Sequence, residues 1–205
     1  MEKEEQLFRK RVQELAEICF RRDVPANTDF LTLNEQTIFQ SISGSLPPVK
    51  YILSGGLDSS ERKVVCFLPS YEEELKDPPF ECLNIAPVNK KFAGELSHRD
   101  LLGAIMSLGI ERSMIGDILL KDGEAYVFVM KKMSRYLTET LSSVRHTTVG
   151  VSACRDVNEF LKPEFEEICG TVSSIRLDSI VALCGRLSRT KAAAYIEGER
   201  VSVNG

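Results

Sequence analysis

The chain has no tryptophan, only two histidines, and six cysteines that form no C-x-x-C pair. Small zinc domains need closely spaced Cys and His ligands, so this composition argues against a metal site. Unpaired thiols are typical of cytosolic proteins, in which a cysteine usually serves as a small buried hydrophobe. We therefore expect reduced thiols, no metal and no cofactor.

Long apolar runs and a strong charge imbalance are also missing. No stretch approaches the roughly 20 apolar residues that a membrane span needs, and the charged opening MEKEEQLFRKR has no apolar core of a signal peptide. We therefore expect a cytoplasmic protein without a membrane partner. Because the net charge is −4, any nucleic-acid site must be a local basic patch on an otherwise acidic protein.

The 205 residues are enough for one large domain or two to three small ones. Local patterns divide the chain into a first block over residues 1–75, a middle block over 76–164 and a tail over 165–205. In the first block, a helical stripe over 7–19 precedes a capping box, Thr32 to Glu35, that opens a second helix. Strands are predicted over 49–53 and 63–67, around a glycine turn.

The middle block alternates strands and helices in the order βαββαβ. Strands are predicted over 80–86, 115–120, 125–130 and 147–153, and helices from Ser97 to Leu108 and over 131–141. This order is the ferredoxin-like pattern of many RNA-recognition modules. The predicted fold class is therefore α+β.

The tail has the clearest local pattern. Apolar residues at i, i+3, i+4 and i+7 predict a short helix with one packed face: Leu177, Ile180, Val181 and Cys184. Gly185 lies where a helix end is usually capped, and Ser188 is a good N-cap for a second helix that ends at Gly198. Residues 201–203 alternate as a strand before an Asn-Gly turn.

Basic residues concentrate around these two helices. Between residues 171 and 195 the basic residues are Arg176, Arg186, Arg189 and Lys191, and the one acidic residue is Asp178. A helix N-terminus with free N–H groups and adjacent basic side chains suits a phosphate. Composition alone would favour a solvated helix pair.

The order of the motifs resembles two known patterns. The tail resembles the S-four-type RNA-binding domain. The likeness is carried by Arg176-Leu177-Asp178, Leu187 to Ala192, Ile196-Glu197-Gly198 and Val201 to Gly205. The middle block resembles the YlmH family of bacterial RNA-binding proteins in the runs His98 to Ala104, Leu108 to Arg112 and Ile115 to Ile118. The first domain of that family is matched by Glu61 to Lys63 and Phe67 to Pro69.

The resemblance implies a small α/β first domain, an RNA-recognition-like middle domain and a C-terminal S-four-type domain. It implies structured ribosomal or transfer RNA as the partner, in translation or stalled-ribosome handling, with no DNA and no catalysis. The RNA-binding residues would be Arg176, Arg186, Ser188, Arg189, Thr190 and Lys191. Since an S-four-type domain normally continues past the Val-Asn-Gly turn, we expect an incomplete domain that stops at Gly205.

Two motifs suggest enzymes instead. Ser54 to Ser60, SGGLDSS, reads like the phosphate loop of ATP pyrophosphatases, but the following run is β-branched and stops at Pro69. A glycine hairpin turn is the better interpretation, and an ATP-dependent RNA-modifying enzyme is the alternative. His98-Arg99-Asp100 mimics the kinase catalytic loop, but Ile105 stands where that loop needs Asn, which excludes a kinase.

A second contact surface is suggested in the middle block. Tyr126 and Phe128 share one face of a strand, where they could stack RNA bases, lie in the core or lie under the first domain. We favour packing, because aromatic residues in strands are usually buried. His98 and Arg99 are candidates for an RNA or interdomain contact. A protein–protein adaptor that docks through these surfaces is a further alternative.

Overall fold

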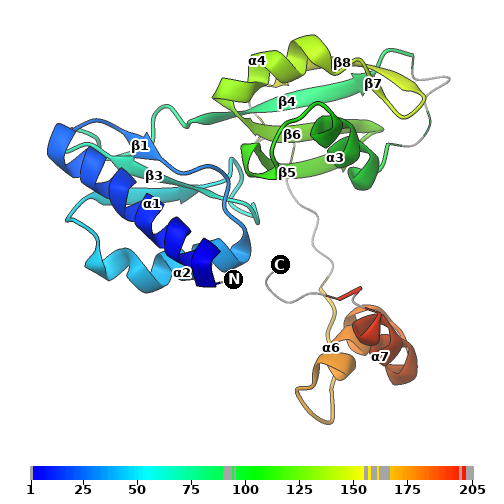
Figure 1. Ribbon diagram of the computed structural model, residues 1–205. Helices are drawn as coiled ribbons and strands as arrows, with labels where there is room; N and C mark the ends of the chain where they lie inside the picture. Colours follow the sequence, from blue (N-terminus) through cyan, green and yellow to red (C-terminus); the bar gives the residue numbers. More distant parts are fainter. Residues whose placement is uncertain are drawn as a thin grey trace. The chain divides into compact units, whose positions relative to one another are not determined.

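A computed structural model of the chain describes residues 2–89, 94, 96–154, 157, 161, 167–198 and 200–201. It has two compact units, Met1–Lys162 and Pro163–Gly205 (Figure 1). The predicted boundary near residue 75 lies inside the first unit, so separate first and middle domains remain a proposal. In the part of the chain that is described, no helix is long and apolar enough to cross a membrane.

The first half of unit 1 is a small three-stranded antiparallel sheet covered by two helices. The strand order is β1-β3-β2, and the elements are α1 (Glu2–Arg22), β1 (Ala26–Asn27), α2 (Leu33–Ile42), η1 (Ser43–Ser45), β2 (Lys50–Ser54) and β3 (Val64–Leu68). The capping box of Thr32 and Glu35 is present, as predicted. The central strand β3 is buried along its whole length. Val65 and Phe67 pack with residues of α1 and α2, and Val64 and Cys66 pack in the core of the second half.

The second half of unit 1 is a five-stranded antiparallel sheet in the order β5-β6-β4-β8-β7. Its elements are β4 (Phe80–Pro87), α3 (His98–Ser107), η2 (Arg112–Met114), β5 (Ile115–Lys121), β6 (Glu124–Met130), α4 (Lys131–Thr140), β7 (Ser143–Val144) and β8 (Thr147–Cys154). The four long strands have the ferredoxin-like order, which confirms the predicted βαββαβ fold. The short strand β7 was not predicted, because two residues are too few to show alternation.

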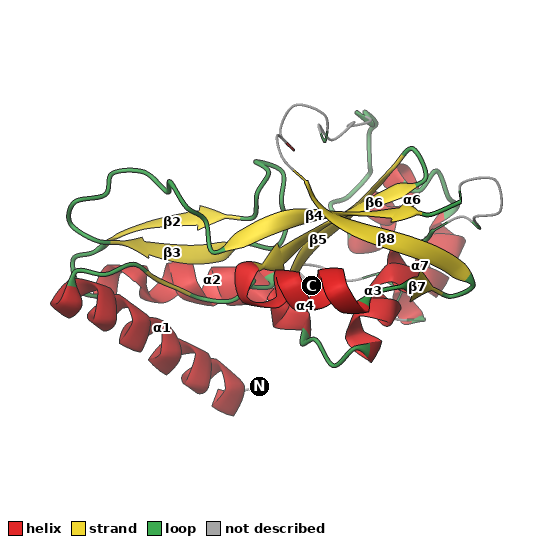
Figure 2. Ribbon diagram, turned by 90° about the horizontal axis from the view of Figure 1, so that it is seen from above, coloured by secondary structure: helices red, strands yellow, loops and turns green. Residues whose placement is uncertain are grey.

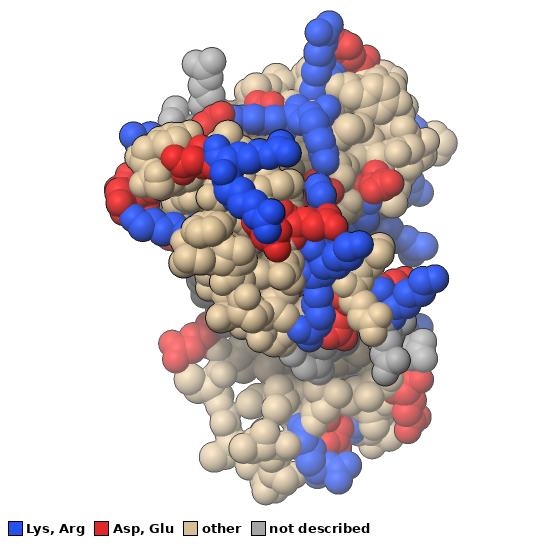
Figure 3. Space-filling model, turned by 60° about the vertical axis from the view of Figure 1, so that its left-hand side comes forward, with Lys and Arg blue, Asp and Glu red and all other residues tan. Residues whose placement is uncertain are grey.

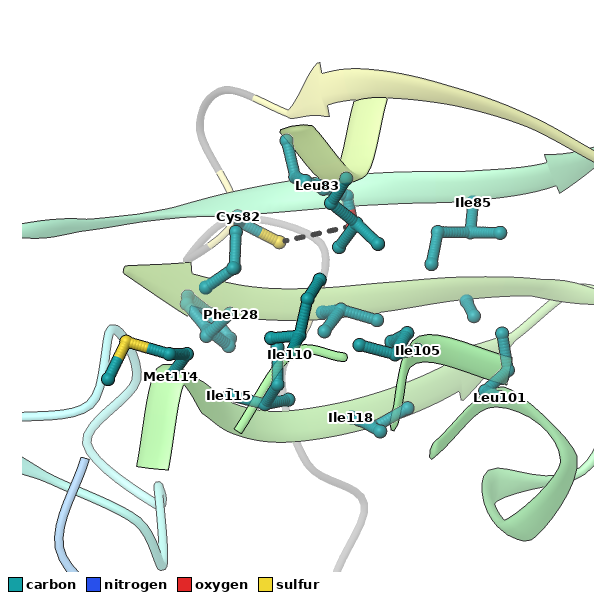
Figure 4. Close-up of a cluster of buried hydrophobic side chains, with 14 of the residues drawn as sticks. Cys82, Leu83, Ile85, Leu101, Ile105, Ile110, Met114, Ile115, Ile118 and Phe128 are labelled. Carbon is teal, nitrogen blue, oxygen red and sulfur yellow. Dashed lines mark hydrogen bonds between the residues drawn. The ribbon is translucent and has the colours of Figure 1, made fainter. Parts of the chain in front are cut away.

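Helices α3 and α4 cover one face of this sheet (Figure 2). Ala125, Val127 and Val129 of β6 point to that face and are fully buried, as their small apolar side chains suggested. Figure 4 shows how Leu101 and Ile105 of α3 meet Ile85 and Ile118 from the strands.

The two halves of unit 1 meet at an aromatic cluster. Phe30 from the first half packs on Phe80, with ring centroids 5.2 Å apart, and Phe80 packs on Phe128 at 6.4 Å. Phe128 is 1% exposed. The core that includes these rings also contains Val64 from β3, so one hydrophobic core spans both sheets.

Arg62 and Asp117 form the polar part of the same junction. The Asp117 carboxylate accepts hydrogen bonds from the backbone N–H groups of Glu61, at 2.7 Å, and of Arg62, at 3.1 Å. The Arg62 guanidinium donates to the carbonyls of Ile115 and Phe30, both at 2.9 Å. Because a register shift lies between Ile115 and Ile118 in β5, a bulge there sets the direction of the Asp117 side chain.

A second arginine lies beside the first. The Arg112 guanidinium donates to the Ile115 carbonyl at 2.6 Å. Burial, followed by the charge of Arg62, lowers the pKa of Arg112 to about 10. Burial likewise lowers the pKa of Arg62, and Glu35 and Asp117 oppose that effect. Both arginines therefore bear a desolvation cost. Arg62 bears it to join backbone segments of the two halves, whereas Arg112 bonds carbonyls of its own half, at Ile115 and Gly116.

The predicted hairpin turn after β2 fits into this junction. Gly56 has φ +98°, and a Cβ there would fall 2.1 Å from Cε1 of Phe128. At Gly55 a Cβ would fall 2.3 Å from the Arg62 carbonyl oxygen. The two glycines therefore let the loop backbone pack closely on Arg62 and on the Phe128 ring. After the loop, the chain enters β3, which pairs with β2 in antiparallel fashion.

Replacing Gly56 with alanine should destabilise unit 1 by about 2 kcal/mol or more, since the new methyl group meets both a left-handed backbone and the Phe128 ring. Gly103→Ala is the matched control, because a Cβ at Gly103 in α3 meets nothing within 4 Å. It should stabilise the helix by about 1 kcal/mol. Urea unfolding followed by circular dichroism measures both, and equal midpoints for the two variants would contradict this account of the junction.

Candidate nucleic-acid interface

Unit 2 contains the two predicted tail helices, α6 (Leu177–Cys184) and α7 (Arg189–Glu197). The Ser188 hydroxyl accepts a hydrogen bond from the Lys191 N–H at 3.3 Å, which confirms it as the N-cap of α7. The predicted strand at 201–203 and the turn at 204–205 lie largely outside the described residues.

The predicted packed face of α6 was wrong. Leu177 and Ile180 are 39% and 41% exposed, whereas Ser179 and Ala182 are buried. Small residues let two helices approach closely, and Ala192 on α7 is fully buried. Apolar periodicity therefore located the helix but selected the wrong face, because contact with α7 uses small side chains rather than large ones.

Asp178 brings two of the predicted cations together. Its carboxylate accepts a hydrogen bond from Arg189 at 2.8 Å and another from Arg176 Nε at 3.1 Å. These bonds, with that from Arg189 the stronger cause, lower the pKa of Asp178 to about 2. The Arg176 and Arg189 side chains stay 68% and 56% exposed. One carboxylate thus orients two guanidinium groups from different helices and leaves them accessible to a ligand.

Arg186 occupies an unusual backbone position. The Leu187 N–H donates to the Ala182 carbonyl at 2.8 Å, and the Arg186 N–H donates to the Leu183 carbonyl at 3.2 Å. This is the Schellman motif, whose left-handed residue is usually glycine. Arg186 takes that position with φ +50°, whereas Gly185, the predicted cap, has a right-handed conformation.

The remaining tail candidates are all on the surface. Ser188, Thr190 and Lys191 are exposed, as is Arg186. The structure also places Arg200 over the ring of Tyr195, 5.7 Å from its centroid. The sequence analysis did not name this cation, because Arg200 lies beyond the end of α7 and no local pattern indicates that its side chain returns to Tyr195.

The candidates in unit 1 are divided between surface and core. His98 and Arg99 are exposed at the start of α3, where Ser97 caps the helix by accepting from the Asp100 N–H. Asp100 also accepts from Arg145 at 3.4 Å. Phe128 is buried in the core at the junction, which agrees with the packing that the sequence analysis favoured over base stacking.

Tyr126 lies on the same sheet face as Phe128, beyond the aromatic cluster. Its hydroxyl lies 3.5 Å from Glu124 Oε2, which also accepts from Asn84 at 2.9 Å. Burial, followed by the charge of Glu124, raises the pKa of Tyr126. A carboxylate beside the ring is unfavourable for an RNA phosphate, which makes the tail the stronger candidate interface.

Basic and acidic side chains are interspersed on the face drawn in Figure 3, without one extended patch of a single sign. Among the described residues, no group of three or more His, Cys, Asp or Glu side chains could hold a metal ion. In the tail, exposed arginine and lysine side chains lie close together, and this is a feature of surfaces that contact anions.

Comparisons with known proteins agree with this picture. A family model described as "Putative RNA-binding domain in YlmH" matches residues 80–159. The Bacillus subtilis (strain 168) protein named "Ribosome-associated protein quality control protein P2" is 31% identical over 180 residues, which cover 86% of this chain and 68% of that protein. The solved structure of "Cell division protein ylmH from Streptococcus pneumoniae" superposes with a TM-score of 0.60 at 23% identity.

That structural match covers 77% of this chain and 94% of the Streptococcus pneumoniae chain, and it supports the α+β fold. The match to the Bacillus subtilis relative includes most of both sequences, and the family model falls on the ferredoxin-like half of unit 1. The chain therefore belongs to the YlmH family.

Proposed function

We propose that this chain is a non-catalytic, cytoplasmic RNA-binding protein that contacts structured ribosomal or transfer RNA on the ribosome. The observation that carries the proposal is the arrangement in which Asp178 orients Arg176 and Arg189 while both remain exposed. The name of the Bacillus subtilis relative supports a ribosomal setting, and the family model supports RNA as the ligand.

The tail would bind RNA by contacting phosphates. Arg176, Arg189 and Arg186 come from the start of α6, the start of α7 and the turn between them, so their guanidinium groups can engage neighbouring phosphates of one RNA surface. Lys191 adds a compact charge, and the exposed hydroxyl of Thr190 adds a hydrogen-bond donor. Such contacts recognise the shape of a folded RNA rather than its sequence.

The alternative of an ATP-dependent enzyme finds less support in the geometry. A phosphate loop needs glycines whose backbone faces a ligand and then a helix, whereas Gly55 and Gly56 face Arg62 and Phe128. The segment after the loop forms strand β3. The SGGLDSS motif is accounted for by packing between the two halves of unit 1.

Replacing Arg189 and Lys191 together with alanine should weaken ribosome binding and flatten its salt dependence, because two phosphate contacts are lost. The slope of log K against log salt should decrease by about 1.8. Co-sedimentation of the full chain with ribosomes across a salt series measures this slope. A variant ending at Pro163 should lose the tail-dependent binding.

The matched control replaces Lys10 and Arg21 with alanine, since both are exposed basic residues on α1 that pair with neighbouring glutamates. It carries the same charge change as the tail variant. An equal loss of slope in both variants would indicate a general charge effect and would overturn the assignment of the tail as the interface.

Replacing Arg186 with glycine should have opposite effects on folding and on RNA binding. Glycine removes the cost of the left-handed backbone, about 1 kcal/mol, and should slow amide exchange in α6 and α7. The same change removes a phosphate contact and should weaken binding. Arg186→Lys, which keeps the charge and the strain, is the control, and undiminished RNA affinity in the glycine variant would remove Arg186 from the interface.

A further inference from the structure

Two cysteines face each other in the sheet of unit 1. In the pairing of β4 with β8, Cys82 and Cys154 are direct partners, so their side chains lie on the same face of the sheet. Cys82 is 3% exposed and lies beside Phe128 at the junction (Figure 4). Cys154, the last residue of β8, is partly exposed.

This placement is close to what a disulfide requires. Directly opposed residues of an antiparallel pair have Cα atoms about 4.5–5.5 Å apart and side chains on the same face. Disulfides form at Cα separations of about 4.4–6.8 Å. No change of register or of strand direction is therefore needed to join the two sulfur atoms.

We propose that Cys82 and Cys154 are a reversible redox pair, which forms a cross-strand disulfide when the chain meets a small-molecule disulfide of the glutathione class. The inference is independent of RNA binding. The partly exposed Cys154 thiolate attacks the small disulfide, forming a mixed disulfide and releasing one thiolate. Cys82 then loses its proton and attacks Cys154 Sγ, which releases the second thiolate. Two protein thiols are thus oxidised and one small disulfide is reduced to two thiols.

Cys154 acts first because it is the accessible member of the pair. Burial, and then the neighbouring Cys154, raises the pKa of the Cys82 thiol to about 12. The thiolate form of Cys82 is therefore rare near neutral pH, and the second step should limit the reaction. Below that pKa, each additional pH unit should increase the rate of ring closure about tenfold.

The bond would fasten the end of β8 to the middle of the sheet. The closed ring would contain all of α3, β5, β6 and α4, so it constrains a long stretch of the unfolded chain. Loops of this length give disulfides a large stabilising effect, and we expect the Tm of unit 1 to rise by about 5 °C or more.

The test uses the full-length chain with Cys169 and Cys184 replaced by serine, because both of these thiols are exposed and would react independently. The protein is incubated with oxidised glutathione over a pH series, quenched with acid, digested and analysed by mass spectrometry. The expected product is one cross-link between the peptides that contain Cys82 and Cys154, lost on reduction, with a rate that rises with pH and with a higher Tm.

Adding Cys154→Ser gives the matched control, which should form no cross-link at Cys82 and show no rise in Tm. A mixed disulfide that stays on Cys154 at every pH would overturn the proposal. So would a cross-link that joins Cys82 to any other cysteine. Since Cys154 is at a strand end and partly exposed, its replacement by serine should leave the fold intact, as circular dichroism can verify.

Discussion

The contact between Asp117 and the backbone of Glu61 and Arg62 determines the architecture of unit 1. One carboxylate satisfies two N–H groups of the other half, and the Arg62 guanidinium reaches back to carbonyls at Ile115 and Phe30. Around this polar centre the aromatic rings are buried and closely packed. Loss of Asp117 would remove the partner of two backbone donors, of which the Arg62 N–H is partly buried, and an unpaired donor away from water is costly. The two sheets are therefore held as one body.

This junction gives several motifs of the YlmH pattern a structural role. Arg62 from Glu-Arg-Lys and Asp117 from Gly-Asp-Ile form the junction itself, and Gly116 lets Phe30 approach, since a Cβ there would fall 2.6 Å from its ring. The glycines of SGGLDSS have the same role. Because the first half covers Phe128, the sheet of the RNA-recognition-like half loses part of the face on which such modules stack bases. The exposed cations of the tail are the stronger basis for RNA contact.

The fold was largely predictable from local patterns. The capping box at Thr32, the N-caps at Ser97 and Ser188, and the alternation over 125–130 depend on neighbouring residues, and all of them are present. Contacts between distant segments were not predictable in the same way. Nothing near Arg62 indicates that it meets Ile115, and the packed face of α6 depends on the small residues of α7. For the site, the sequence identified the basic residues, but not the role of Asp178 in orienting two of them or the left-handed backbone of Arg186.

The tail illustrates how charge and conformation compete in a small helical unit. Asp178 removes one net positive charge from the basic surface of the tail, yet it fixes the direction of Arg176 and Arg189, which would lower the entropy lost in the proposed contact with a phosphate. Arg186 bears a conformational cost that glycine would avoid. Both features reduce charge or stability in the free chain, and the proposed contact of these arginines with a phosphate would offset that cost. Glycine fits the Schellman position without strain, so the arginine found there trades backbone stability for an exposed cationic side chain on the turn between α6 and α7.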